Sequence, residues 1–107
     1  MDFGPTKGDE LQKIRPALVV SSNATIRGKL QVRLVAPITG WKDHFANLFW
    51  HVRIEPDEVN GLSKTSSVNA LQLRGVDVQR FQQRVGRVSA TLMEEVAAAI
   101  AGVVEYK

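Results

Sequence analysis

The hydrophobic and polar positions in the first half of the chain alternate over short segments that predict β-strands. Residues 16–22 form a valine-rich apolar run between turn-forming residues, which is typical of a buried strand. Residues 30–39 alternate and predict a second strand, in which Pro37 indicates an edge or a bulge because proline cannot donate a ladder hydrogen bond. The inward face of this strand would carry Leu30, Val32, Leu34, Ala36 and Ile38, and the outward face Gln31, Arg33 and Thr39.

Further along the chain, residues 50–55 give the clearest alternation and predict a strand with one buried face. The inward positions of that strand are Trp50, Val52 and Ile54. The pair Asn60 and Gly61 marks a tight turn, and residues 68–76 predict another strand. Residues 79–84 then predict a short helical turn, and residues 85–88 a brief strand.

The end of the chain has a different period and predicts a helix of about sixteen residues. Ser89 has the side chain of an N-cap, and the apolar positions that follow at helical spacing are Leu92, Val96, Ile100 and Val103. Five or so short strands followed by one helix favour a mainly β fold, a small antiparallel barrel with the C-terminal helix packed on it. At 107 residues, the chain is expected to form a single domain over residues 1–107.

Composition narrows the possible chemistry. The chain contains no cysteine, which excludes a disulfide framework, a thiolate zinc site and a cysteine nucleophile. Its apolar share of 44% and charged share of 23% are those of an ordinary globular protein. No apolar run approaches the length of a membrane span and no leader opens the sequence, so we expect no membrane partner and a cytoplasmic location.

The net charge of +3 is unevenly distributed along the sequence. Residues 1–42 hold seven basic and three acidic side chains, whereas residues 43–107 hold seven basic and eight acidic side chains. A cationic first part suits a phosphate partner, as RNA, DNA or a nucleotide. A solvated surface with a mild bias is the simpler alternative.

The loop before the first predicted strand is the most informative place for chemistry. It combines Lys7 and Lys13 with Glu10, and it ends at Arg15, which Pro16 biases toward extended geometry. An arginine held at the start of a strand suits a phosphate because its planar fork matches two phosphate oxygens. A structural ion pair between Glu10 and Arg15 is the alternative interpretation.

Other sites are weaker candidates. His44 and His51 could form an acid/base pair for RNA cleavage, although two ordinary surface histidines are the simpler interpretation. No spacing of His, Asp or Glu matches a metal site, so no metal and no cofactor is predicted. Residues 4–8 look like part of a phosphate-binding loop but lack its strand-loop-helix context and its Gly-Lys-Ser/Thr ending.

Several short motifs, taken in order, resemble the MazF/PemK family of toxins, the ribonuclease halves of bacterial type II toxin–antitoxin pairs. The resemblance covers essentially the whole chain. The segments that carry it are residues 2–10, 15–21, 37–39, 61–67, 71–74 and 86–88, together with the closing helix.

The resemblance implies an SH3-like barrel with a C-terminal helix, usually a homodimer with an RNA channel across its interface. It also implies metal-independent cleavage of single-stranded RNA, commonly mRNA, at short sequence motifs. A small acidic antitoxin would neutralise the toxin by lying over that channel, and the toxin–antitoxin complex would bind DNA. Glu10, Arg15 and Thr39 match the family's catalytic positions, whereas Ile14 stands where some members have a histidine.

In such a protein, the RNA would be held by cationic and polar side chains, with Trp41 available to stack on an unpaired base. An ordinary core position is the alternative for Trp41. The RNA-binding set would be Lys7, Lys13, Trp41, Lys42, Lys64, Thr65, Ser66 and Gln72.

Two other functions stay open for this fold. One is a gyrase-poisoning toxin that acts by binding protein, and the other is a silent member that binds antitoxin or RNA without cutting. Members of the family also carry about ten further residues and an apolar strand before the segment that begins here at Asp2. We therefore expect an upstream start, a partner's strand or a dimer rearrangement to cover the gap in the barrel.

Overall fold

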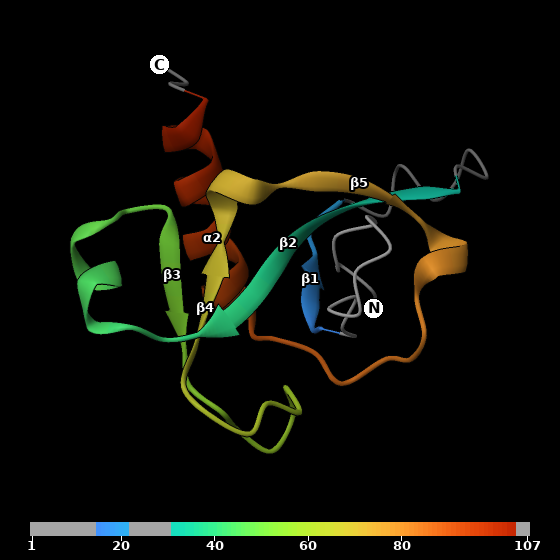
Figure 1. Ribbon diagram of the computed structural model, residues 1–107, viewed down its shortest axis with the longest axis horizontal. Coiled ribbons are helices and arrows are strands. Elements are labelled where there is room, and N and C mark those ends of the chain that lie inside the picture. Colours follow the sequence, from blue (N-terminus) through green and yellow to red (C-terminus); the bar gives the residue numbers. More distant parts are fainter. Residues whose placement is uncertain (1–14, 22–30, 105–107) are drawn as a thin grey trace, which may run out of the picture.

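The computed structural model describes residues 15–21 and 31–104, and these form an antiparallel sheet with one C-terminal helix (Figure 1). The strands are β1 (Ala17–Val19), β2 (Val32–Gly40), β3 (His51–Ile54), β4 (Ser66–Asn69) and β5 (Arg74–Asp77). The helix is α2 (Ala90–Val103), and three short 3-10 turns are η1 (Asp43–Asn47), η2 (Ala70–Gln72) and η3 (Val78–Arg80). The predicted fold class, a mainly β domain with a C-terminal helix, is confirmed.

The long strand β2 organises the sheet. The strand order is β1-β2-β4-β3, and β5 also pairs with β2. Because β4 pairs with the end of β2 and β5 with its beginning, the elements β3, β4 and α2 gather at the C-terminal end of β2 (Figure 1). Among the described residues, the sheet stays open and does not close into the expected barrel. The expectation of an additional first strand falls outside the described residues.

Pro37 lies inside β2 and not at an edge of the sheet, so the expectation of an edge strand is wrong. The N–H of Ile38 donates to the carbonyl of Pro16, 3.1 Å away, so the nitrogen of Pro37 points toward the opposite edge of β2. There η2 separates β4 from β5. Proline has no N–H to donate, and its nitrogen faces the gap between β4 and β5, where the ladder is interrupted. No ladder hydrogen bond is therefore lost at Pro37.

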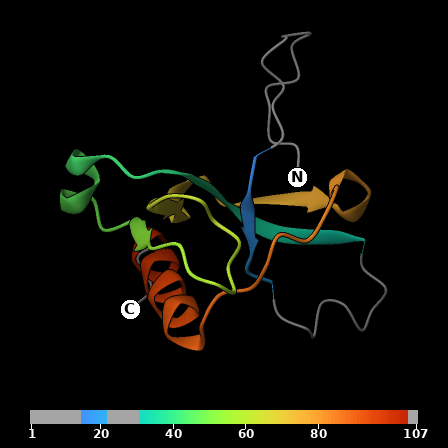
Figure 2. The same cartoon turned by 90° about the horizontal axis from the view of Figure 1, so that it is seen from below.

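The two faces of the β3–β4 pair have opposite character, as the alternation of residues 50–55 predicts. Val52 and Ile54 are buried on the face that packs against α2, and Val68 of β4 joins them in the core. On the other face, β3 presents His51 and Arg53. Figure 2 shows α2 lying along one side of this end of the sheet.

The helix α2 begins and packs as the sequence predicts. The hydroxyl of Ser89 accepts a hydrogen bond from the N–H of Leu92 at 3.1 Å, which caps the first turn. Leu92, Val96 and Ala99 are buried against the sheet. Near the end of α2, a β-carbon built on Gly102 would lie 2.8 Å from Cε2 of Phe49, so this glycine leaves room for the ring.

The prediction that Val32, Leu34, Ala36 and Ile38 form a buried face is wrong for the first half of the strand. Val32 and Leu34 are 42% and 39% exposed, whereas Val35, one residue further, is fully buried. Among the described residues, the helix α2 packs on β3 and η2 and not on the face that carries Val32 and Leu34. Only the second half of the strand, with Ala36 and Ile38, contributes that face to the core.

Two other predicted strands differ in the structure. Residues 68–76 are divided between β4 and β5, because the side chain of Asn69 accepts the N–H of Leu71 at 3.0 Å and starts the turn η2. Residues 85–88 form no strand; the N–H of Arg87 donates to the carbonyl of Val59, 3.0 Å away, without a regular ladder. Of the predicted helical turn in residues 79–84, only residues 79 and 80 lie in the 3-10 turn η3, and residues 81–84 form no turn.

Candidate functional site

Four polar side chains form a row across the strands on the face opposite α2. Thr39 of β2 pairs with Ser67 of β4, and Ser67 pairs with Arg53 of β3. The register between β1 and β2 joins Ala17 to Pro37, and continued by two residues it brings Arg15 opposite Thr39. Direct cross-strand partners point to the same face of a sheet. We call Arg15, Thr39, Ser67 and Arg53 the polar row.

A hollow of about 600 Å³ lies beside this row. It collects residues from the segment before β1, from β2 and the loop after it, from β3, and from β4 and the loop before it. Its lining residues are Arg15, Thr39, Gly40, Trp41, Lys42, Phe45, His51, Lys64 and Asn69. We call it the cationic hollow, because three of these side chains are basic and none is acidic. Such a surface attracts an anion.

Five of the predicted site residues meet in the cationic hollow. They are Arg15, Thr39, Trp41, Lys42 and Lys64. Arg15 is exposed and Thr39 is half-buried, so the guanidinium stays accessible while the hydroxyl is held in the sheet. The predicted cation, before β1, and the predicted hydroxyl, on β2, therefore line the same hollow.

An aromatic wall closes one side of the hollow. The ring of Phe45, from η1, stacks on the ring of His51 with their centroids 3.6 Å apart and their planes 4° from parallel. Trp41 meets Phe45 edge-on at 5.7 Å, and the guanidinium of Arg53 lies 5.2 Å from the centre of the Trp41 ring. Trp50, and not Trp41, packs against the hydrophobic core. The alternative of a core position for Trp41 is therefore wrong.

His51 lines the hollow although it is not among the predicted catalytic or RNA-binding residues. Its Nδ1 lies 2.8 Å from the hydroxyl oxygen of Ser67, which is itself fully buried. Burial, and then the nearby His44, lower the pKa of His51 below its ordinary value of 6.5. His44 is exposed on η1 and does not line the hollow, so the two histidines occupy different environments.

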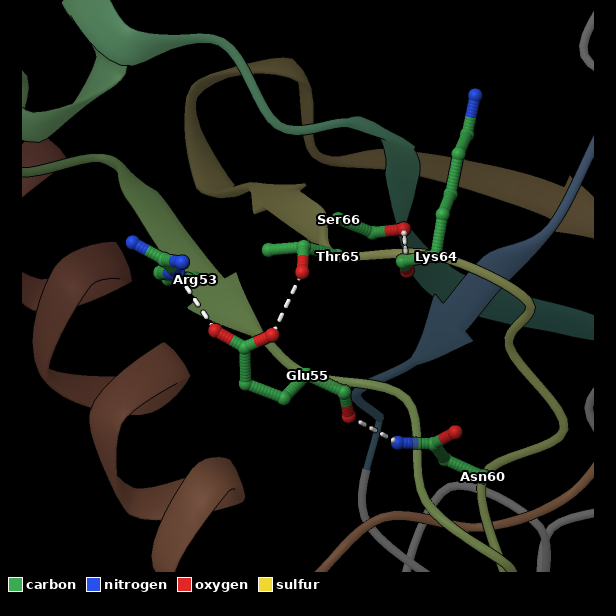
Figure 3. Close-up of polar contacts among 6 residues, drawn as sticks. All are labelled: Arg53, Glu55, Asn60, Lys64, Thr65 and Ser66. Carbon is green, nitrogen blue, oxygen red and sulfur yellow. Dashed lines mark hydrogen bonds and ion pairs between the residues drawn. The ribbon is translucent and has the colours of Figure 1, made fainter.

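The loop that leads into β4 is tied to the end of β3 by Glu55 (Figure 3). One carboxylate oxygen accepts from Nε of Arg53 at 2.7 Å, and the other accepts from the hydroxyl of Thr65 at 2.6 Å. These two hydrogen bonds, that from Thr65 first, lower the pKa of Glu55. The backbone carbonyl of Glu55 accepts the amide of Asn60 at 2.8 Å, which holds the intervening turn.

Lys64 points away from the Glu55 contacts (Figure 3). A β-carbon built on Gly40 would lie 3.1 Å from Nζ of Lys64, so the lysine passes over a glycine of β2 on its way to the hollow. Its backbone carbonyl accepts the hydroxyl of Ser66 at 2.9 Å. The absence of a side chain at Gly40 therefore gives this ammonium group its place.

The remaining predicted RNA-binding residues are not in the hollow. Ser66 is 4% exposed, on the face that packs toward α2, and the hydroxyl of Thr65 is occupied by Glu55. Gln72 is exposed at the end of η2 and does not line the hollow. Glu10, Lys7 and Lys13 lie outside the described residues.

Four residues that line the hollow are outside the predicted site set: Gly40, Phe45, His51 and Asn69. Of these, the sequence suggested chemistry only for His51, as half of a pair with His44. His51 was assigned to a polar strand face, and that placement is confirmed; the partner strand that brings it beside Thr39 was not visible. For Phe45, the only indication in the sequence is that an aromatic residue stands in a polar loop.

A larger hollow of about 740 Å³ lies elsewhere, between β1 and residues 81–88. It is lined mainly by apolar side chains and by no described Asp or Glu, with Arg84 and Arg87 at its charged side. Within residues 15–21 and 31–104, no group of three or more His, Asp or Glu side chains is placed to hold a metal ion. None of the described helices has the length and apolar character needed to cross a membrane.

Comparison with known families identifies the chain. Residues 1–104 match the family described as the PemK-like, MazF-like toxin of type II toxin–antitoxin systems. The chain belongs to this family of toxins. No curated protein sequence matches the MazF-like toxin described here.

Solved structures agree with the assignment of this MazF-like toxin. The toxin MazF-mt6 of Mycobacterium tuberculosis is 28% identical to it, with a TM-score of 0.74 over 91% of this chain and 92% of that one. A MazE–MazF structure from Deinococcus radiodurans is 24% identical, with a TM-score of 0.77 over 99% and 89% of the two chains. A mycobacterial endoribonuclease solved with its cognate antitoxin is 20% identical, with a TM-score of 0.75 over 92% and 88%. The last two show a shared fold.

Proposed function

We propose that this MazF-like toxin is a metal-independent endoribonuclease that cleaves single-stranded RNA, such as mRNA, at short sequence motifs. The observation that carries the proposal is that Arg15 and Thr39 line one hollow, whose described lining residues also include Lys42 and Lys64 and no acid. A guanidinium and a hydroxyl on neighbouring strands can both donate hydrogen bonds to one phosphate. The family to which the chain belongs supports the same activity.

The reaction would be attack of a ribose 2′-hydroxyl on the adjacent phosphorus, which releases the 5′-oxygen of the next nucleotide. Negative charge increases on the non-bridging oxygens as the fifth bond forms. Arg15 keeps its charge at every working pH and would stabilise those oxygens, while the hydroxyl of Thr39 donates a second hydrogen bond. The products would be a 2′,3′-cyclic phosphate and a 5′-hydroxyl.

The rest of the hollow would hold the single strand. Lys42 and Lys64 are exposed at its rim and would contact flanking phosphates. Trp41 and Phe45 offer aromatic surface for an unstacked base. Arg53 already lies against Trp41 and keeps a cation near the same base. Glu10 is the family's loop glutamate and is proposed to help prepare the 2′-hydroxyl.

An acidic antitoxin is the second proposed partner. A chain rich in Asp and Glu would find three basic groups in the cationic hollow, and no acid stands among the lining residues that the structure describes. The relatives solved as MazE–MazF complexes support this partner for a chain of the same fold. A homodimer is also proposed, because Val32 and Leu34 expose apolar surface on a face that α2 does not cover.

The test is incubation of the purified toxin with a long single-stranded RNA, with and without EDTA. We expect endonucleolytic fragments in both reactions, with 2′,3′-cyclic or 3′-phosphate ends. Activity that disappears in EDTA and returns with magnesium, or products with a 3′-hydroxyl, would contradict the proposal. Arg84→Ala is the matched control for Arg15→Ala, because Arg84 is an exposed arginine outside the cationic hollow.

A further inference from the structure

His51 shares the face and the surroundings of the phosphate-binding residues. It is the first residue of β3, and Ser67 separates it from Thr39: the serine pairs with Thr39 in the ladder and contacts Nδ1 of His51 at 2.8 Å. Arg15, Thr39 and His51 all line the cationic hollow. A titratable ring is thus placed where phosphate chemistry would occur.

We propose that His51 is the catalytic base of the reaction, the group that takes the proton from the attacking 2′-hydroxyl. This inference rests on the proposed RNA cleavage and names a proton carrier for it among the described residues. It departs from the simpler sequence interpretation, in which His51 is an ordinary surface histidine, and it gives to His51 the role considered for Glu10.

The ring of His51 is held on two sides. The hydroxyl of Ser67 fixes Nδ1, and the parallel ring of Phe45, 3.6 Å away, fixes the plane. The tautomer that donates its Nδ1–H to Ser67 leaves a lone pair on Nε2, at the other side of the ring. The described residues give His51 a hydrogen bond at Nδ1 and none at Nε2, and we assign the contact with the substrate hydroxyl to Nε2.

The charged groups around His51 favour its neutral form. Among the described residues, the titratable groups around His51 are His44 on η1, the basic side chains that line the hollow, and Arg53, which is paired with Glu55. The basic side chains of the hollow are Arg15, Lys42 and Lys64. Burial and His44 lower the pKa of His51, so the ring is uncharged at neutral pH. An uncharged imidazole is the form that accepts a proton.

Each bond that forms in the proposed step is matched by one that breaks. The 2′-oxygen forms a bond to phosphorus while its proton passes to Nε2 of His51, and the bond from phosphorus to the 5′-oxygen breaks. The leaving 5′-oxygen takes a proton from water, and the hydroxide that remains removes the proton from the imidazolium. No oxidant, reductant or metal takes part, and the enzyme returns to its starting form.

The first experiment compares His51→Ala with His44→Ala in single-turnover cleavage of a short RNA, with RNA affinity measured on the same proteins. We expect His51→Ala to lose about a hundredfold or more in rate while it still binds RNA, because a positioned base contributes about 10²–10⁴-fold. Added imidazole should restore part of that rate. His44→Ala should remain within about threefold of the wild type, and a similar result for His51→Ala would overturn the proposal.

The second experiment measures the cleavage rate against pH for the wild type, His51→Gln and Glu10→Gln. If His51 is the base, the wild-type rate rises with pH through a pKa below 6.5 and then levels, and His51→Gln removes that rise. A rise centred near the ordinary carboxyl pKa of about 4.3, lost in Glu10→Gln and kept in His51→Gln, would assign the role to Glu10 and overturn the proposal. A wild-type protein that cuts no RNA would instead refute the proposed function.

A substrate with sulfur in place of the leaving 5′-oxygen separates base from acid, because a thiolate leaves without a proton. The His51→Ala defect should persist with this substrate. If the defect disappears, His51 protonates the leaving group and the assignment as base is wrong.

Discussion

Thr39 and Ser67 are direct cross-strand partners, and only one of their two hydroxyls is available to a ligand. Ser67 is fully buried and contacts Nδ1 of His51, whereas Thr39 is half-buried and lines the cationic hollow. The buried hydroxyl therefore serves to orient a ring, and the accessible one can meet a phosphate.

Arg15→Ala should abolish most cleavage without unfolding the protein. Removing one preorganised donor to the transition state costs about 3 kcal/mol, a hundredfold or more in rate. Arg15 is exposed, so the melting temperature should stay within about 2 °C of the wild type. Single-turnover kinetics and thermal melting measure both effects. Arg84→Ala should leave the rate unchanged, and wild-type rates from folded Arg15→Ala would remove Arg15 from the mechanism.

Ser67→Ala should reduce cleavage through His51 and not through the substrate. The variant leaves Nδ1 of a half-buried ring without its partner, a cost of about 1 kcal/mol or about fivefold in rate. RNA affinity should stay unchanged, because Ser67 is buried beneath the hollow. Ser63→Ala, an exposed serine in the preceding loop, is the control. A loss of affinity without loss of rate would show that Ser67 shapes the RNA surface instead.

The pH dependence of stability should reveal the environment of His51. Its pKa is lower in the folded protein than the ordinary 6.5, so below pH 6.5 the unfolded chain binds more protons. Stability is therefore complete above pH 6.5 and decreases as the pH falls toward the folded pKa. His51→Gln should flatten the melting temperature over this window. A curve that is identical in wild type and variant between pH 5 and pH 7 would show that the ring is not perturbed.

A part of the fold and of the site follows directly from the sequence. The alternation of residues 50–55 and the cap at Ser89 each depend on local chemistry, and both are confirmed. Arg15 and Thr39 could be named because they match catalytic positions of the family that the sequence resembles, and both line the cationic hollow.

The features of the fold and of the site that the sequence did not predict depend on packing between distant segments. Residues 68–76 read as one strand because their apolar positions alternate, but Asn69 bonds its own backbone two residues on and starts η2. The inward face of β2 changes because α2 covers only one end of the sheet. His51 became a site residue only through the register that sets Ser67 beside it, which no local pattern contains.

Substitution of the two tryptophans should separate RNA affinity from protein stability. Trp41 lines the cationic hollow, so Trp41→Ala should weaken RNA binding by about 1–3 kcal/mol, the value of a base stacked on an aromatic ring. Trp50 packs against the core, so Trp50→Ala should lower stability by about 2 kcal/mol or more and reduce RNA affinity only through unfolding. Fluorescence titration with RNA and urea denaturation measure the two effects. Equal RNA affinity of Trp41→Ala and wild type would exclude stacking at this position.

Two segments of the backbone cross at Gly61 and Gly86. We expect the stability of the fold to be most sensitive there to the addition of a β-carbon. Gly61 has a φ of +71°, and a β-carbon there would lie 2.3 Å from the carbonyl oxygen of Val85. A β-carbon on Gly86 would lie 2.2 Å from the carbonyl oxygen of Val59, so each glycine allows the backbone of the other segment to approach.

Gly61→Ala and Gly86→Ala should each destabilise the protein by about 1–3 kcal/mol, because an obstructing backbone cannot move aside as a flexible side chain can. The melting temperature should fall by about 4–8 °C for each kcal/mol in a domain of this size. The double variant should cost less than the sum, since one displacement of the crossing relieves both contacts. Gly75→Ala is the control, because its β-carbon would meet only a methyl group of Val32, at 3.1 Å. If Gly61→Ala has the melting temperature of the wild type while Gly75→Ala has a lower one, the crossing does not hold residues 81–88 against the sheet.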